Sequence, residues 1–198
     1  MLTRDIVILS VGCGILMGVQ FAFTSYLVSY LSDVLTVLGV AMPVILAGNM
    51  YSIASAGGFA GRLGLGLISD KIFKGRRKGT MVAVNVIGTL VILLTAIAVP
   101  KMRIPFIAIT VLLYGLTGIS FTGLQLSMVS ELAGVEFSGS ATGFTLALGF
   151  LGMMTIPTAF GAAVDHSGGY FGGWMLLFAL SIIGTVLLLF VKEQKQAK

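Results

Sequence analysis

Charged residues are scarce in this chain of 198 amino acids. Lys, Arg, Asp and Glu make up only 10% of it, whereas hydrophobic residues make up 57%. A soluble domain carries about a quarter charged residues, so this chain cannot hide its apolar surface in a single water-soluble core. Together with a mean hydropathy of +1.07, the composition predicts an all-α integral membrane protein that crosses the bilayer several times.

Cysteine and histidine are almost absent, with one residue of each. A single cysteine, Cys13, excludes an intramolecular disulfide. The sequence also lacks an HExxH motif, a GxSxG motif and a phosphate-cradling glycine loop. These absences argue against an enzyme, and no residue pattern predicts a cofactor or a metal site.

Six apolar stretches are long enough to cross about 30 Å of hydrocarbon. They cover residues 6–31, 42–69, 80–99, 105–129, 139–164 and 171–191. The connections between them are short, so we expect residues 1–198 to form a single bundle of six transmembrane helices. Pro157 lies inside the fifth stretch, where the missing N–H is expected to bend the helix.

Basic residues are distributed unevenly between the two ends of this predicted bundle. Nine of the 12 Lys and Arg residues lie in the N-terminus, the second connection and the C-terminal tail. The opposite end has Lys101 and Arg103, and Arg62 lies within the second stretch. The positive-inside rule therefore predicts a multi-pass protein of the plasma or inner membrane with both termini cytoplasmic. Because the basic residues flank the membrane, we do not expect nucleic acid as a partner.

Polar residues are concentrated in the first, second and fourth stretches. The third and sixth are nearly pure hydrocarbon and are expected to face lipid. A polar group in a membrane costs free energy unless it finds a partner or a wet cavity. We therefore expect these residues to form a substrate-binding cavity wall: Gln20, Thr24, Tyr51, Arg62, Tyr114, Phe121 and Gln125. Snorkelling or an ion pair with Asp70 or Glu131 is an equal alternative for Arg62, as is a hydrogen bond between helices for Gln20.

Glycines four residues apart recur in several of the stretches. The pairs are Gly14 with Gly18, Gly57 with Gly61, and Gly139 with Gly143. We interpret them as places where helices approach closely, with no chemistry of their own.

The second connection carries an acid followed by a basic run. It reads Gly66-x-x-x-Asp70-Lys71 and then Gly75-Arg76-Arg77-Lys78. This pattern resembles the signature loop of the major facilitator superfamily of transporters, usually G-x-x-x-D-[RK]-x-G-[RK]-[RK], with two additional residues, Phe73 and Lys74. The longer form resembles the second signature loop of organic-anion members, especially the organophosphate:phosphate antiporters.

Two further segments carry the same resemblance, which covers essentially the whole chain. Residues 130–133 followed by 139–144 resemble the junction of helices ten and eleven in these antiporters. Residues 160–170 resemble the end of helix eleven and its outer turn. The resemblance implies half of a twelve-helix fold, helices seven to twelve. The partner expected is then an N-terminal six-helix half or a second copy of this chain.

The resemblance also implies a conformational latch at the cytoplasmic end. A carboxylate there can cap a neighbouring helix and pair with Arg76 or Arg77, with Glu131 as a third member. The alternative is that the basic loop only sets the orientation. The latch residues expected are Gly66, Asp70, Lys71, Gly75, Arg76, Arg77 and Glu131.

Gln20 departs from the antiporter pattern, because it falls where those proteins place a phosphate-binding arginine. A glutamine cannot neutralise a phosphate dianion, which favours a monocarboxylate, a sugar acid or a neutral solute. We therefore expect a secondary active transporter that moves a small organic solute, preferably an anion, by alternating access. The alternative is a transport-inactive fragment, or a small membrane protein that binds and modulates a partner.

Overall fold

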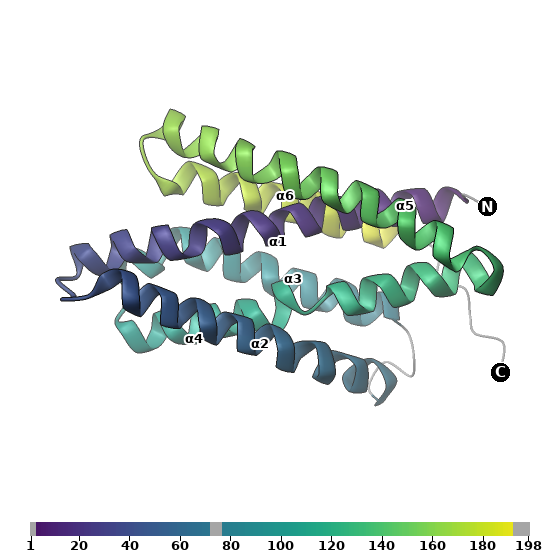
Figure 1. The fold of residues 1–198 in the computed structure, drawn as a ribbon, viewed down its shortest axis with the longest axis horizontal. Coiled ribbons are helices and arrows are strands. Elements are labelled where there is room, and N and C mark those ends of the chain that lie inside the picture. Colours follow the sequence, from purple (N-terminus) through teal and green to yellow (C-terminus); the bar gives the residue numbers. More distant parts are fainter. Residues whose placement is uncertain (1–2, 72–76, 192–198) are drawn as a thin grey trace.

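The chain is helical throughout the part that can be described. The computed structural model describes residues 3–71 and 77–191, and for residues 67–71 it describes the backbone only. Within these ranges the elements are α-helices, one 3₁₀ turn and one π-helical turn, with no β-strand. The prediction of an all-α protein is confirmed (Figure 1).

The first two helices form a long antiparallel pair. α1 covers Arg4–Val37, and the Thr3 hydroxyl caps its start by accepting a hydrogen bond from the Ile6 N–H at 3.4 Å. Gly39 follows its end in the left-handed conformation, with φ of 75°, which a glycine adopts without strain. α2 covers Pro43–Lys71 and starts on proline, whose missing N–H costs nothing at the first helical position.

Prolines also mark the connection between the third and fourth helices. α3 covers Arg77–Ile97 and is followed by a 3₁₀ turn, η1, over Val99–Lys101 with Pro100 inside it. α4 covers Ile104–Tyr114, again with a proline in its first turn. The chain thus reverses within six residues, as expected for a short connection.

The predicted fourth span is interrupted. After α4 the chain forms a π-helical turn, η2, over Gly115–Ile119, and α5 begins at Thr122. The Thr117 hydroxyl donates to the Leu113 carbonyl at 2.7 Å, and the Ser120 hydroxyl donates to the Thr117 carbonyl at 3.3 Å. Such side-chain bonds satisfy carbonyls that a widened helical turn leaves without their usual N–H donors.

The chain reverses direction within the predicted connection at residues 130–138, but helix continues closer to the turn than expected (Figure 1). α5 covers Thr122–Ser167, and its backbone leaves helical geometry at Gly134, with φ of 73° and ψ of 168°. The helix turns back on itself at this residue, so α5 has two arms (Figure 1). Pro157 lies inside the second arm, where the backbone angles are helical, and the bend predicted there stays a prediction. α6, Tyr170–Phe190, completes the fold.

Several helices suit a membrane by length and composition. Four described stretches are apolar enough to cross one: Arg4–Val37, Arg77–Ile97, Ile104–Ser167 and Tyr170–Phe190. α2 is not among them, and α4 to α5 form a single stretch. The helices are therefore consistent with a membrane protein, while six separate spans are not confirmed.

The helices pack in two layers. α1, α2 and α5 lie nearer the viewer in Figure 1, and α3 and α6 lie behind them. α1 is central and packs on α2, α5 and α6, while α3 packs on α6. α1 and α3 begin, and α6 ends, at the same end of the molecule (Figure 1). We call this the charged end.

Candidate functional site

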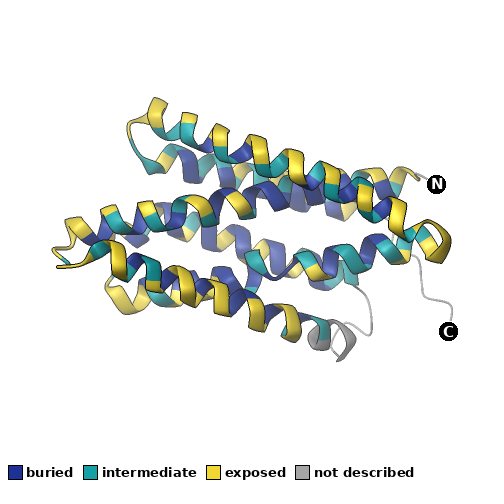
Figure 2. Ribbon diagram, in the orientation of Figure 1, coloured by how far each residue is buried: buried dark blue, intermediate teal, exposed yellow. Residues whose placement is uncertain are grey.

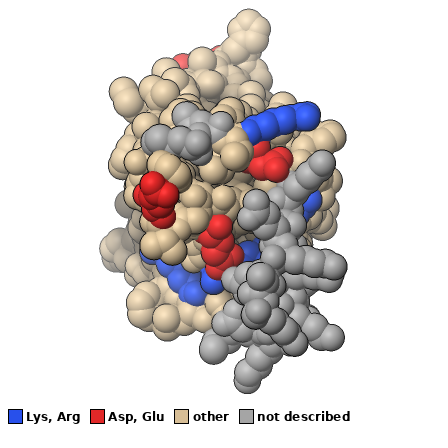
Figure 3. Space-filling model, turned by 90° about the vertical axis from the view of Figure 1, so that its right-hand side faces the viewer, with Lys and Arg blue, Asp and Glu red and all other residues tan. Residues whose placement is uncertain are grey.

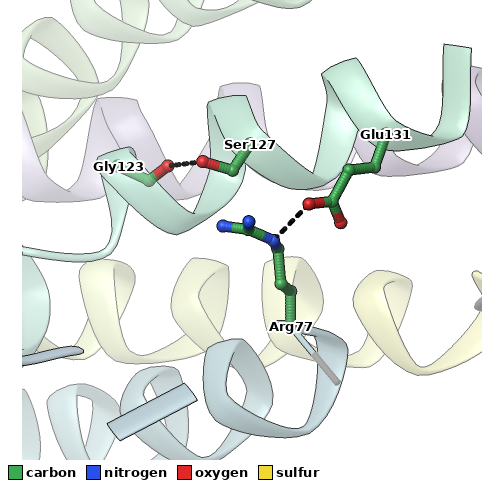
Figure 4. A network of polar contacts seen from close by, with 4 residues as sticks. All are labelled: Arg77, Gly123, Ser127 and Glu131. Atoms are coloured by element: carbon green, nitrogen blue, oxygen red, sulfur yellow. Dashed lines mark hydrogen bonds and ion pairs between the residues drawn. The ribbon is translucent and has the colours of Figure 1, made fainter. Parts of the chain in front are cut away.

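An ion pair joins two helices at the charged end. Arg77, the first residue of α3, reaches the carboxylate of Glu131 on α5, with Nε and Oε1 2.6 Å apart. Figure 4 shows the guanidinium beside Ser127, whose hydroxyl donates to the Gly123 carbonyl on the same helix at 3.0 Å. The Arg77 and Glu131 side chains are 28% and 37% exposed, so water screens the pair in part.

Lys78, the next residue, binds a third helix. Its Nζ donates to the carbonyls of Leu189 and Val191, at 2.8 and 2.6 Å. These carbonyls lie at the end of α6, where a helix has no N–H left to offer them and where its dipole attracts a cation. Two consecutive basic residues of α3 therefore hold α5 and α6 at the same end.

The predicted latch is described in part. Arg77 and Glu131 come together, and Gly66 lies half-buried in α2 with open space where a Cβ would be. Asp70 and Lys71 end α2, but their side chains are outside the described set. Gly75 and Arg76 lie outside the described residues altogether. The role of Asp70 therefore stays a prediction.

Charges of both signs gather at the charged end. Figure 3 views this end and shows basic and acidic side chains close to one another on it. The described ones include Arg4, Asp5, Arg77, Glu131 and Glu136. Because basic and acidic side chains lie near one another, this end can form ion pairs between helices. It is not a surface of a single charge.

Three predicted cavity residues lie in the packed interior. Tyr114, Phe121 and Gln125 are each at most 1% exposed, and Tyr114 stacks on Phe23 with ring centroids 3.5 Å apart. Tyr114 and Phe121 line a small cavity of about 10 Å³, together with Asn85 and Ser181. That volume holds about one water molecule, so in this conformation these side chains do not border a space for an organic solute.

Gln20 and Thr24 lie half-buried on α1. The Thr24 hydroxyl donates to the carbonyls of Gln20 and Phe21, at 3.1 and 3.0 Å. The side-chain oxygen of Gln20 is buried and has no hydrogen-bond partner among the described residues. The hydrogen bond between helices that we considered for Gln20 is therefore not formed through this oxygen.

Tyr51 and Arg62 are exposed on α2. Eleven residues apart, they fall on one face of the helix. Arg62 lies about 14 Å of helix rise before Lys71, where α2 ends. Its side chain forms no ion pair or hydrogen bond with the described side chains of residues 3–66 and 77–191. An exposed arginine within a transmembrane helix would have to meet water, an anion, a lipid head group or a protein partner, because hydrocarbon cannot stabilise its charge.

Every helix has exposed residues (Figure 2), and their chemistry differs from helix to helix. The exposed residues of α3 from Ala83 onward, and those of α6, are all apolar. The exposed residues of α1, α2 and α5 include hydroxyls and charges as well as apolar side chains. Lipid suits the first surface and not the second.

Sequence reasoning missed several residues of the polar surface. Ser25 and Ser29 are exposed on α1, and Ser55 is exposed on α2, on the same face as Tyr51 and Arg62. The spacing of four residues between Ser25 and Ser29 was a signal for a shared face. Their exposure could not be read from the sequence, because serine is common on both buried and open faces of membrane helices.

Comparison with known proteins adds no assignment. No protein-family model matches the chain, and a search of curated proteins finds no match. The chemistry of the described residues is therefore the basis for a functional proposal.

Proposed function

We propose that this chain is one half of a secondary active transporter of the major facilitator type, which moves a small organic anion across the membrane by alternating access. In this proposal it contributes six transmembrane helices, including α2 and the two arms of α5. A separate six-helix half or a second copy of the chain completes the cavity. No prosthetic group is required.

The exposed arginine of α2 is the observation that supports the proposal most. Arg62 lies about 14 Å of helix rise before the end of α2. It is on the surface that carries hydroxyls and charges, and it has no partner among the described residues. An anionic solute in a water-filled cavity would supply the missing charge. Tyr51 and Ser55 on the same face add hydrogen-bonding groups. The ion pair of Arg77 and Glu131 suits a contact that breaks when one side of the molecule opens.

Transport by proteoliposomes tests this proposal. The chain is extracted in mild detergent together with any protein that stays associated with it, reconstituted, and assayed for counterflow of radiolabelled monocarboxylates and sugar acids. We expect Arg62→Gln to reduce counterflow at least about tenfold, since one charge-assisted contact is worth about 1.5–3 kcal/mol. Lys101→Gln is the matched control, because it removes one exposed positive charge from the connection between α3 and α4. Equal activity of the two variants would contradict the role of Arg62.

A second function is favoured by the small volume of the cavity beside Tyr114 and Phe121. A chain whose predicted cavity residues are packed together could bind and modulate another membrane protein through its polar surface. In that case the wild-type chain shows no counterflow with any solute of the panel. It would instead stay associated with a partner protein through extraction in mild detergent.

A further inference from the structure

One buried polar side chain has poor partners. Gln125 on α5 is 0% exposed. Its amide Nε2 lies 3.3 Å from the Met17 sulfur on α1, and its Oε1 has no hydrogen-bond partner among the described residues. An amide can form four hydrogen bonds, and a thioether is a weak acceptor. Gln125 therefore satisfies little of its hydrogen-bonding capacity in this conformation.

The surroundings of Gln125 are apolar. Cys13 and Met17 of α1, and Leu124 and Met128 of α5, belong to one buried hydrophobic cluster. A leucine would fill a similar volume there without an unpaired oxygen, so glutamine makes this contact between α1 and α5 less stable than it could be. When the first arm of α5, which carries Gln125, moves away from α1, water reaches the amide. The cost of the unpaired oxygen then disappears.

We propose that the Met17–Gln125 contact between α1 and α5 opens and closes in the working protein, and that Gln125 keeps its closed form from becoming too stable. A fully apolar contact would be more stable in its closed form and would open less often. The proposal concerns a movement of this chain and goes beyond the transport proposed above, because it needs no solute.

Cys13 is a native reporter of this opening. It is the one cysteine of the sequence, it is 0% exposed, and it lies four residues from Met17 on the same face of α1. Maleimides react with the thiolate, which requires water. Cys13 should therefore be modified in the folded protein when the contact opens and stay protected when it is closed.

The experiment measures the rate of Cys13 modification by N-ethylmaleimide in folded protein in detergent. Wild type is compared with Gln125→Leu, and we expect the variant to react about tenfold more slowly. Met17→Leu removes the sulfur acceptor at nearly constant volume and should react faster than wild type. In denaturant all proteins should react at one rate, which shows that the thiol itself is unchanged.

Thr80→Val is the matched control for general stabilisation. Thr80 is 1% exposed and its hydroxyl is also without a partner among the described residues, but it lies on α3. This variant should raise the melting temperature and leave the Cys13 rate at the wild-type value. Equal slowing in Thr80→Val and Gln125→Leu would mean that Cys13 reacts through global unfolding, and would overturn the proposal. An unchanged or faster rate in Gln125→Leu would overturn it too. Rates as expected with no counterflow of any solute would leave the opening intact and contradict only the transport function.

Discussion

At the scale of single residues, glycine decides how closely α1 and α5 cross. A Cβ placed on Gly18 would lie 2.5 Å from the carbonyl oxygen of Gly152, and one on Gly14 would lie 3.0 Å from that of Leu148. Backbone thus lies against backbone at this crossing. The sequence interpretation of Gly14 and Gly18 as a site of close approach is confirmed, and so is that of Gly57 and Gly61. Gly139 and Gly143 have no neighbour within 4 Å of the position that a Cβ would take, so the interpretation of close approach is wrong for this pair within the described residues.

The first residue-scale prediction concerns Gly18→Ala. We expect it to destabilise the folded protein by about 1–3 kcal/mol, because the added methyl meets a backbone carbonyl that cannot move aside like a flexible side chain. The measurement is the melting temperature of purified protein in detergent. Gly143→Ala is the control on α5, with open space at its Cβ, and should melt at or above the wild-type temperature. Equal melting of both variants would mean that the crossing is looser than described.

At the scale of elements, the break in α5 rests on one residue. Gly134 has φ of 73° and ψ of 168°, a region of backbone conformation that residues with a Cβ rarely adopt. Helix formers stand on both sides, with Glu131 and Ala133 before Gly134 and Glu136 after it, so helix continues up to the break and resumes after it. From the sequence we expected a connection of nine residues here, because a lone glycine is a weak signal among residues that also occur in loops.

The element-scale prediction is that Gly134→Ala destabilises the fold by about 1–3 kcal/mol through backbone strain alone. No atom lies within 4 Å of the position that its Cβ would take, so a clash cannot contribute. Chemical unfolding monitored by circular dichroism gives the free energy of unfolding, with Gly139→Ala as a control five residues further along the same helix. A Gly134→Ala variant as stable as wild type would show that α5 does not require the left-handed residue.

The π-helical turn η2 was beyond prediction for a different reason. Its residues, Gly115 to Ile119, have no proline and no loop signal. α2 packs closely on this turn: Gly61 faces the Leu116 carbonyl, and Gly58 faces the Ile119 side chain. The π-helical turn therefore coincides with a close contact to α2. Such a contact between helices cannot be read from a sequence.

At the scale of the whole molecule, the sequence predicted polarity better than it predicted the direction of side chains. The apolar character of the third and sixth stretches agrees with the apolar exposed residues of α3 and α6. Tyr114, Phe121 and Gln125 were expected along a cavity wall, but all three are packed inside the bundle. Helical spacing fixes which residues share a face, whereas the neighbours of that face depend on the tertiary arrangement.

The division of the surface yields a prediction for the intact protein in lipid. Spin labels are placed at Leu90 on α3, Ile183 on α6, Ser25 on α1 and Ser55 on α2, one at a time and with Cys13 replaced by Ser. We expect Leu90 and Ile183 to be relaxed by oxygen, which partitions into lipid. Ser25 and Ser55 should be relaxed by a water-soluble nickel chelate, because their surface should face water or a partner.

Power-saturation electron paramagnetic resonance measures both accessibilities on the same samples. The four positions are all exposed in the isolated chain, so burial within the chain cannot account for a difference between them. Access to oxygen alone at all four positions would contradict a two-sided molecule, and with it the basis for a polar cavity or a protein partner.

The lengths of the helices have a consequence for what a soluble binding protein can reach. α3 and α6 have 21 residues each, about 32 Å of helix, close to the thickness of a hydrocarbon layer. α1 has 34 residues, about 51 Å, and the Tyr30 hydroxyl fixes its height by donating to the Thr95 carbonyl near the end of α3 at 2.7 Å. A hydrocarbon layer that matched the length of α3 and α6 would therefore leave the last two turns of α1 outside it, on the side away from the charged end. An antibody could bind the exposed residues of this helix end without entering the membrane.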